Sequence, residues 1–501
     1  MTQDWLRPLP FGTSCWNEGL VEAYDHGYFL SIRRVTSTQV YSFLVKTDIN
    51  GYILWYKRLG TGAYPISLLR ISTTSDGAIV TGGMVDCDPV IIKYSPCGEI
   101  QWCSQIHTPG FCDWVRDVRQ TASGEYVVLT QYSDPSENNR IQLYKLNSAG
   151  QWLWKRNYPA VPPFFSDDGH DVMALDDGFL VSGLCYAPDS GMPSGVGYER
   201  PYFFRTDTVG NVIWRNVYGM GNGYHGFIGH NTQVSPSGHF YCSGWHSNYC
   251  DTPALIKCMA DGSEGYFQDV IPGSCPGSNG SLNFFDDTTL VIRASGKIGG
   301  VWHVKWLRMD TLGIEHFSKS IADNPYIGAS GWSIVTHDKK IVGLSKHDNV
   351  NYLFKLNAQF EYDSVYSYPY VYDSLCPYLI VSDTIDPVCD LLVGSQEKTL
   401  PEIEMRLRVW PNPAHDRVRV EAPPQLEIVE KDGGSIPYNR WGQCHLEVYS
   451  LSGRIVYSCD IHQNNRVLDI PVTDWQRGMY LFRLSYRGST CASALVTLYH
   501  P

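Results

Sequence analysis

Residues 43–59, FLVKTDINGYILWYKRL, carry a pattern that returns six more times along the chain. An apolar run ends in a basic residue, a turn residue follows five positions later, and an aromatic residue follows four positions after that. The basic positions are Lys46, Lys93, Lys145, Arg205, Lys257, Arg308 and Lys355. The turn positions are Gly51, Gly98, Gly150, Gly210, Gly262, Gly313 and Phe360. The aromatic positions are Trp55, Trp102, Trp154, Trp214, Tyr266 and Phe317, with Ser364 in the seventh copy. Seven copies in register indicate a repeat protein.

A second phrase, a turn followed by an apolar strand, precedes each copy. It reads DHGYFLSI from Asp25, SDGAIVTGG from Ser75 and DDGFLVSG from Asp176. Glycine in such a turn tolerates the positive φ that a tight hairpin requires. With one more short strand, each repeat of 47 to 60 residues holds about four strands, which is typical of a propeller blade. The sequence therefore predicts an all-β chain with a seven-bladed β-propeller, whose tryptophans fill the space between blades.

Composition limits the classes of partner. The chain has 501 residues and a formal net charge of −12, which disfavours electrostatic binding of nucleic acid or anionic lipid. An apolar stretch long enough for a membrane span is absent from the sequence. The N-terminus MTQDWLRPLP lacks a basic segment followed by an apolar one, so we expect a mature or shortened form of an exported protein. We expect its first residues to lead into the first blade.

The chain contains 15 cysteines and no C-x-x-C pair, which favours an oxidising environment over a zinc ribbon. Cys376 and Cys389 flank a short interval after the last repeat, and we expect them to pair and pin this tail to the propeller. A further disulfide is expected within the cluster Cys87, Cys97, Cys103 and Cys112.

The C-terminal segment changes character. Its strands alternate, as in VRVEA from Val418 and YLFRLS from Tyr480, which indicates a small antiparallel sandwich with an exposed face. We therefore predict a propeller over residues 1–375, a cysteine-containing tail and linker over 376–404, and an Ig-like β-sandwich over 405–501.

A hairpin is predicted around Leu451 and Ser452 in this segment. Pairing Tyr449 with Arg454 across that turn would place Cys444 opposite Cys459. We therefore predict a cross-strand disulfide between these two cysteines.

The C-terminal segment resembles the sorting domain of proteins exported by the type IX secretion system of Bacteroidetes. The resemblance rests on Pro411, Asn412, Pro413, Asp416, Gly453, Arg454, Gly478 and Tyr480. It implies a partner, the type IX machinery, and a protein that is secreted or held at the outer-membrane surface after removal of this domain.

The repeat resembles propellers of unknown role that are joined to such sorting domains. Its Gly-x-x-x-Trp spacing is also similar to the tryptophan-docking repeat of pyrroloquinoline-quinone propellers. Those enzymes resemble eight-bladed rings with adjacent cysteines at the cofactor, whereas this chain has seven repeats and no Cys-Cys pair. We expect no cofactor and no metal.

Two long segments, residues 184–201 and 218–230, exceed simple hairpin turns, and such loops often carry function. A non-enzymatic module that binds a glycan or protein ligand is the predicted function. The ligand-facing rim would include Tyr224, His225, His230, Trp245 and His246.

The alternative is a glycan-active hydrolase or lyase. The sequence lacks sialidase boxes, H-E-x-x-H and G-x-S-x-G. In the absence of these motifs, the candidate catalytic residues are acidic side chains that could converge near the axis: Asp113, Asp117, Asp167 and Asp171. Residues 167–171, DDGHD, are interpreted as a solvated acidic turn, because their spacing does not fit an EF-hand calcium loop.

Overall fold

The structure is a computed structural model. It describes residues 5–499 except 13–14, 37–39, 61–65, 108–112, 134–138, 159–165, 188–197, 220–224, 229–231, 248–250, 321–331, 348–349, 368–375, 377–379, 393–406, 412–413, 422–443, 451–453, 462–466 and 487–488. Within these residues the chain is all β, and none of it forms a helix long and apolar enough to cross a membrane.

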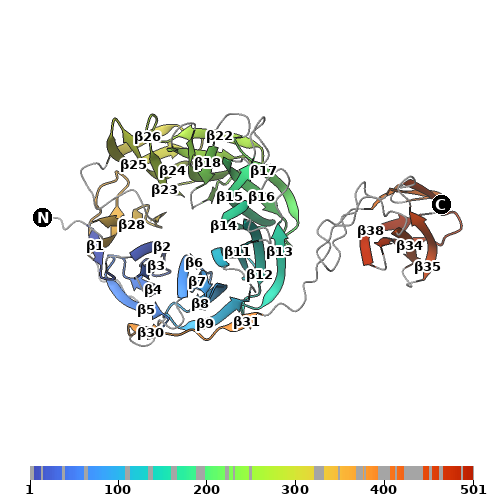
Figure 1. The fold of residues 1–501 in the computed structure, drawn as a ribbon, viewed down its shortest axis with the longest axis horizontal. Coiled ribbons are helices and arrows are strands. Elements are labelled where there is room, and N and C mark those ends of the chain that lie inside the picture. Colours follow the sequence, from blue (N-terminus) through green and yellow to red (C-terminus); the bar gives the residue numbers. More distant parts are fainter. Residues whose placement is uncertain are drawn as a thin grey trace. The chain divides into compact units, whose positions relative to one another are not determined.

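Seven antiparallel sheets follow one another round a ring, so the predicted propeller is confirmed (Figure 1). Blade 1 has β2 (Cys15–Glu22), β3 (Tyr28–Val35), β4 (Val40–Thr47) and β5 (Ile53–Leu59). Blade 2 has β6 (Ile66–Thr73), β7 (Ile79–Val85), β8 (Asp88–Tyr94) and β9 (Ile100–Ile106). Blade 3 has β10 (Trp114–Gln120), β11 (Tyr126–Ser133), β12 (Asn139–Leu146) and β13 (Trp152–Tyr158). Blade 4 has β14 (Asp167–Leu175), β15 (Gly178–Ala187), β16 (Tyr198–Thr206) and β17 (Val212–Val217).

The remaining three blades vary the same plan. Blade 5 has β18 (His225–Ile228), β19 (Gln233–Val234), β20 (Phe240–Ser247), β21 (Asp251–Cys258) and β22 (Glu264–Asp269). Blade 6 has β23 (Gly277–Phe284), β24 (Thr289–Ile298), β25 (Val301–Asp310) and β26 (Glu315–Ser320). Blade 7 has β27 (Ser333–Val335), β28 (Ile341–His347), β29 (Val350–Leu356) and β1 (Leu6–Leu9). The first strand of a blade, such as β2, β6 or β14, lies nearest the centre of the ring (Figure 1).

The two ends of the propeller sequence close the ring. Strand β1 pairs with β29 in antiparallel register, Leu6 opposite Phe354, so the N-terminal residues complete the last blade and do not lead into the first. Trp5, fully buried, then takes the aromatic position that Ser364 leaves empty in the seventh repeat. Its indole lies against Gly51 of blade 1.

The predicted packing role of the repeated aromatics is confirmed. The aromatic side chain of one blade lies against the turn glycine of the next, because that glycine has no side chain to block it. A Cβ atom added at Gly98 would lie 2.7 Å from Trp55, and one at Gly262 would lie 2.5 Å from Trp214. These contacts join the apolar clusters between successive sheets into one ring of packing.

The basic residue of the repeat has a partner that the sequence pattern did not reveal. Lys46 Nζ lies 2.7 Å from Asp25 Oδ1, and both side chains are almost fully buried. The equivalent bridges join a basic residue to an acidic residue in the first turn of the same blade: Lys93–Asp76, Lys145–Glu125, Arg205–Asp177 and Lys355–Asp338. Each bridge therefore ties the third strand of a blade to the turn between its first two strands.

The tail after blade 7 runs along the outside of the first two blades. Strand β30 (Asp383–Ile385) pairs in parallel with β5, and β31 (Asp390–Leu392) pairs in parallel with β9. The predicted Cys376–Cys389 disulfide is wrong, because the extended tail brings each cysteine to blade 2 instead. The bonds are Cys97–Cys376 and Cys103–Cys389. Cys87 and Cys275 each take part in a further disulfide. A bond within the cluster of Cys87, Cys97, Cys103 and Cys112 stays a prediction.

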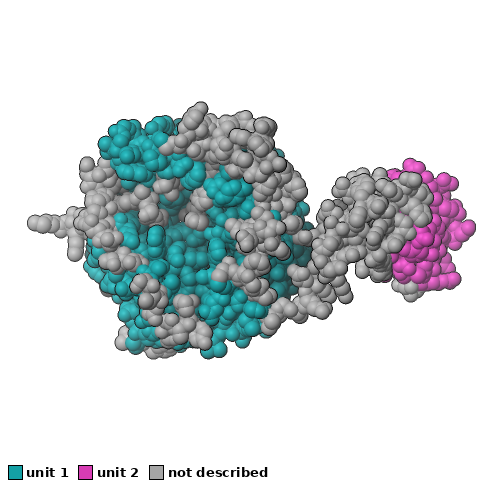
Figure 2. Space-filling model, in the orientation of Figure 1, with its two compact units in different colours: residues 1–393 teal, residues 394–501 magenta. Residues whose placement is uncertain are grey.

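The chain divides into two compact units, Met1–Val393 and Gly394–Pro501 (Figure 2). In the second unit, one sheet has β32 (Arg408–Trp410), β33 (Arg417–Glu421) and β36 (Val467–Pro471). The other has β35 (Ile455–Ile461), β34 (Cys444–Ser450), β37 (Gly478–Tyr486) and β38 (Ser489–Leu498). Both sheets contribute to a single buried cluster that includes Val418 and Phe482, which makes this unit the predicted antiparallel sandwich. The linker bounds stay a prediction, since residues 393–406 lie outside the described residues.

The predicted Cys444–Cys459 disulfide is wrong. Cys459 is a free thiol and faces Leu446 across the hairpin, while Cys444 faces Ile461. A bulge between Val448 and Tyr449 and a longer turn shift the register by two residues from the predicted one.

Candidate functional site

The innermost strands share a bulge at the same level of the ring. Their extra residues are Glu18 in β2, Leu69 in β6, Arg116 in β10 and His170 in β14. A bulge re-aims one side chain and is common beside binding sites. Three of these four residues, from blades 1 to 3, line one cavity.

The cavity has a volume of about 350 Å³. It is lined by Glu18, Arg33, Ser67, Leu69, Arg70, Met84, Trp114, Val115 and Arg116. Among these lining residues three guanidinium groups accompany a single carboxylate. The cavity is therefore a basic spot in a chain whose net charge is −12.

Two of the arginines are held by carboxylates. Arg33 Nε donates to Glu18 Oε1 at 2.7 Å. Arg116 Nη2 lies 2.8 and 2.9 Å from the two oxygens of Asp168, and its Nε donates to Gln131 Oε1 at 2.8 Å. These bonds fix the guanidinium planes before any ligand arrives.

The third arginine, Arg70, lies near charges of both signs: its charge opposes the rise in the pKa of the buried Asp117, and it acts on Arg116 as a like charge. Burial lowers the pKa of Arg116 below its ordinary value; the carboxylate of Asp168 opposes this shift, and the charge of Arg70 adds to it. Each of these two arginines stacks on an indole: Arg70 Cζ is 4.7 Å from the ring centre of Trp332, and Arg116 Cζ is 4.8 Å from that of Trp114. The two cations are thus oriented by aromatic faces and brought close enough to repel.

Two of the acidic residues singled out from the sequence join neighbouring blades. Asp117 Oδ2 accepts hydrogen bonds from the backbone N–H of Val172 and from Arg119 Nε, at 3.1 and 3.0 Å. Asp171 Oδ2 accepts from the N–H of Thr232 at 2.9 Å. Burial raises the pKa of Asp117, and the charge of Asp171 adds to this shift while Arg119 opposes it. These carboxylates hold blades 3, 4 and 5 together and do not line the cavity.

The other two acidic residues are buried as well. Asp113 is 2% exposed, and its backbone N–H donates to Cys87 O at 2.9 Å. Burial raises the pKa of Asp167 to about 6, against the charges of Arg140 and Arg215. The interpretation of residues 167–171 as a solvated turn is wrong, because they form the start of the innermost strand β14.

The predicted rim is only partly described. Tyr224 and His230 lie outside the described residues. His225 lies at the start of β18, and Trp245 and His246 lie near the end of β20, where Phe227 is opposite Trp245 and Gly226 is opposite His246. These three residues share one end of blade 5. Their role stays a prediction.

Sequence reasoning missed the cavity arginines. The available signal was an arginine within a short innermost strand, as in ISLLRIST from Ile66 and WVRDVRQ from Trp114. A charged side chain there must face the axis or be neutralised, because both faces of a blade are packed.

In the second unit, the described motif residues are mostly at the surface. Pro411, Asp416 and Arg454 are exposed. Gly478 begins β37, and the hydroxyl of the buried Tyr480 donates to Gln476 O at 2.8 Å. Asn412, Pro413 and Gly453 lie outside the described residues.

Residues 408–497 match the family model described as the secretion system C-terminal sorting domain. This domain marks the chain as a secreted or cell-surface protein handled by the type IX machinery. No curated protein matches the sequence.

Several solved structures are similar in fold. An ulvan lyase of polysaccharide lyase family PL25, bound to -[GlcA(1-4)Rha3S]-, is 9% identical, with 70% of this chain and 95% of that chain covered and a TM-score of 0.46. A Synechocystis apocarotenoid oxygenase is 12% identical, with 61% and 71% covered and a TM-score of 0.40. A protein of unknown function from Bacteroides caccae is 13% identical, with 52% and 84% covered and a TM-score of 0.33.

Proposed function

We propose that the propeller is the binding module of this secreted or cell-surface protein, and that the cavity of blades 1 to 3 takes an acidic polysaccharide by its carboxylate or sulfate groups. The observation that carries the proposal is that Arg33, Arg70 and Arg116 line one cavity, where the charges of Arg70 and Arg116 repel each other. An anion placed among these guanidinium groups would relieve the repulsion.

The chemistry of the three side chains favours oxyanions of planar or forked shape. A guanidinium group presents paired N–H donors that match a carboxylate or sulfate, and such charge-assisted bonds are among the stronger ones in proteins. The indole of Trp114, also in the lining, has one face against Arg116 and leaves its other face for the C–H side of a sugar ring. Arginine and tryptophan together therefore suit a charged sugar better than a neutral one.

The size of the cavity fits a polymer segment. Its volume, about 350 Å³, is near the lower end of small-ligand sites, which span roughly 300 to 1,000 Å³. One charged sugar would fill it while the polymer continued over the face of the ring. Since the chain as a whole is acidic, binding would depend on these few arginines and not on a general attraction.

A glycan-active enzyme is the second candidate. A hydrolase needs two carboxyl groups roughly 5 to 10 Å apart beside the substrate, and Asp117 and Asp171 are engaged between blades. A lyase needs a side chain that removes a proton from the sugar, and the two candidates are His170 and Tyr186. His170 Nε2 lies 3.8 Å from Asp168. The charge of Asp168 contributes to the raised pKa of Tyr186. However, His170 is 2% exposed, and the pKa of Tyr186, raised chiefly by its bond to Glu199, is about 12. Both facts disfavour proton abstraction, so binding is the better-supported function.

The test is calorimetric titration of the full chain with polygalacturonate, dextran sulfate and neutral dextran. We expect binding to the two acidic polymers only, and at least a tenfold loss of affinity in Arg70→Ala. Arg58→Ala is the matched control, because Arg58 also stacks on an aromatic ring, that of Tyr41 at 4.0 Å, but does not line the cavity. Equal binding of neutral dextran, or an unchanged affinity in Arg70→Ala, would overturn the proposal. Ultraviolet absorbance from unsaturated sugar products would favour the lyase instead.

A further inference from the structure

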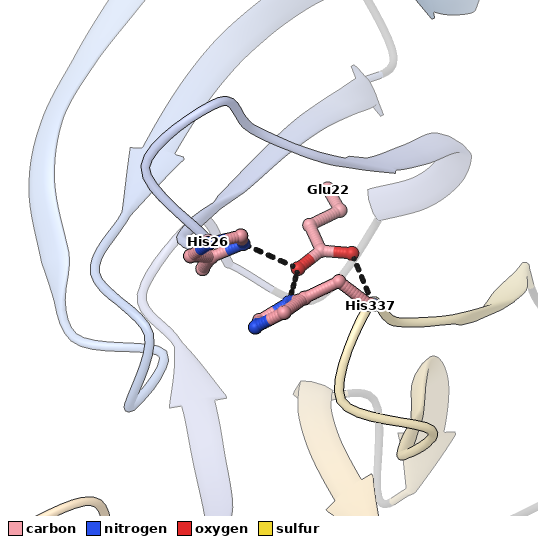
Figure 3. A group of neighbouring side chains, drawn as sticks. All are labelled: Glu22, His26 and His337. Atoms are coloured by element: carbon pink, nitrogen blue, oxygen red, sulfur yellow. Dashed lines mark hydrogen bonds and ion pairs between the residues drawn. The ribbon is translucent and has the colours of Figure 1, made fainter.

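A group of potential metal ligands lies at the seam where the ring closes. Glu22 is the last residue of β2 in blade 1, and His26 lies in the turn that follows. His337 lies in the turn between β27 and β28 of blade 7. Figure 3 shows the three side chains directed toward one another across the two blades. One ligand atom from each residue lies within 4.8 Å of the others.

The three donor atoms are close to the spacing that a small cation needs. Glu22 Oε1 is 3.2 Å from His26 Nδ1 and 2.5 Å from His337 Nδ1. The two imidazole rings are stacked, with centres 3.4 Å apart and planes 24° apart. In a tetrahedral zinc site with bonds of about 2.1 Å, donors are ~3.4 Å apart. A metal lies in the plane of each imidazole ring that binds it, so binding would require the two stacked rings to turn until both Nδ1 atoms face the ion.

Glu22 is held in place for this role by its second oxygen. The backbone N–H of His337 donates to Glu22 Oε2 at 2.9 Å. The carboxylate is thus fixed across the seam while Oε1 faces both rings. Partners that orient the first ligands of a metal are a common property of such sites.

The repeat itself supplies an independent observation. In the first turn of blades 2, 3 and 5 the residue with positive φ is glycine: Gly77, Gly124 and Gly238, at 75°, 82° and 78°. The same hydrogen-bonded position is His26 in blade 1, with φ of 61°, and Lys339 in blade 7, with φ of 57°. A non-glycine residue in this region is strained, so the two turns at the seam both bear a strain that blades 2, 3 and 5 avoid. Such strain collects at functional sites.

The other two donors also depart from their equivalents. The position of Glu22 is held by Thr73, Gln120 and Val234 in blades 2, 3 and 5. The position of His337 is held by Ser75, Ala122 and Pro236 in the same blades. Three departures from the repeat, on two blades far apart in sequence, therefore bring together two imidazoles and one carboxylate.

We infer that Glu22, His26 and His337 bind a zinc ion that joins blade 1 to blade 7. Two imidazole nitrogens and one carboxylate oxygen are a donor set that zinc takes when it keeps a coordination position for water. The side chain of His337 is 45% exposed, so that water position can face solvent. The ion would add a second closure to the ring at the turns, besides the pairing of β1 with β29.

The experiment uses the full chain without an affinity tag, freed of metal by a chelator and titrated with zinc chloride in a calorimeter. We expect one zinc ion per chain and a higher thermal unfolding midpoint at saturating zinc. His26→Gly is the decisive variant, because it restores the residue that blades 2, 3 and 5 have at this turn. It should fold at least as well as the wild type without metal, bind zinc at least tenfold more weakly, and lose the zinc-dependent rise. His337→Ala should lose the binding in the same way.

His316→Ala is the matched control. His316 is an exposed histidine in β26 of blade 6 and lies 3.1 Å from Asp310, but it has no place in the three-residue group. We expect its zinc affinity to equal that of the wild type. Absence of zinc binding in the wild type, or equal binding in His26→Gly and the wild type, would overturn the inference. Cobalt in place of zinc gives a second readout, since a tetrahedral site would show intense visible absorption bands that His26→Gly lacks.

Discussion

The turn glycine of the repeat has two separate reasons to be glycine. Its backbone has positive φ, as at Gly98 with 80°, and the preceding blade places an indole where a side chain would begin. Gly273 has only the first reason, since its φ is 74° and no atom lies within 4 Å of an added Cβ. Substitutions at Gly98 and at Gly273 therefore separate two contributions to destabilisation, that of backbone strain and that of blocked packing.

We expect Gly273→Ala to destabilise the propeller by about 1 to 2 kcal/mol, the cost of positive φ for a residue with a Cβ. Gly98→Ala should cost at least ~2 kcal/mol more, because the new methyl displaces Trp55 from its packed position. Thermal unfolding midpoints of both variants and the wild type measure the difference. Equal shifts for the two variants would mean that the aromatic contact contributes little.

A single buried carboxyl gives a pH-dependent prediction. The pKa of Asp167 is raised by burial from 3.8 to about 6, so between these values the folded chain binds more protons than the unfolded chain. The contribution of this residue to the free energy of unfolding therefore falls as pH rises through this window, by about 3 kcal/mol in total.

Asp167→Asn removes this titration. We expect the stability of the variant relative to the wild type to increase as pH is raised from about 4 to 6 and to stay constant above pH 7. Thermal unfolding at a series of pH values measures this relative stability. A relative stability that is independent of pH would contradict the assigned shift.

At the level of strands, the outer strands β30 and β31 explain why two disulfides join the tail to blade 2. The parallel pairing of β31 with β9 puts Asp390 opposite Ser104, so Cys389 comes beside Cys103. The bonds close intervals of 286 and 279 residues. The first bond to form removes unfolded-state entropy worth on the order of 5 kcal/mol. The second removes less, because the first already joins the same two parts of the chain.

Mapping the disulfides without reduction tests this arrangement. Chymotrypsin cleaves after Trp102 and so separates Cys97 from Cys103. We expect one linked pair of peptides that contains Cys97 and Cys376 and another that contains Cys103 and Cys389. A peptide in which Cys376 is linked to Cys389 would reinstate the pairing predicted from the sequence and contradict the parallel course of the tail.

The sequence was sufficient to predict the number of blades. It was insufficient to predict which distant residues pair. Turn glycines, apolar strands and aromatics recur locally, so counting them predicted seven sheets. Contacts between residues far apart in sequence have no such local signal: Trp5 substitutes for Ser364 across the ring closure, and Cys389 meets Cys103 only through the tail. In the sandwich, a bulge at Val448 and a longer turn together moved Cys459 away from Cys444, since register depends on every residue of the hairpin.

At the level of the whole molecule, the candidate cavity was the least predictable feature. Arg33, Arg70 and Arg116 come from three different blades, and only the ring brings them to one cavity. The rim candidates were chosen from long loops, whereas the described cavity lies on regular innermost strands. The C-terminal unit was more predictable, because its short motifs identify a family and its core is independent of the propeller.

That independence leads to a prediction about export. Deleting residues 394–501 should leave the thermal unfolding midpoint of the propeller and its binding of acidic polysaccharide unchanged, because the two units have separate buried clusters. In a host with a working type IX system, and with a host signal peptide fused to both forms, the full chain should appear at the cell surface or in the medium. The truncated form should accumulate in the periplasm, since it lacks the domain that the machinery recognises. Fractionation and immunoblotting of both forms measure this, with a periplasmic enzyme as the marker of leakage. Export of the truncated form at the level of the full chain would show that the C-terminal unit is not the sorting signal of this protein.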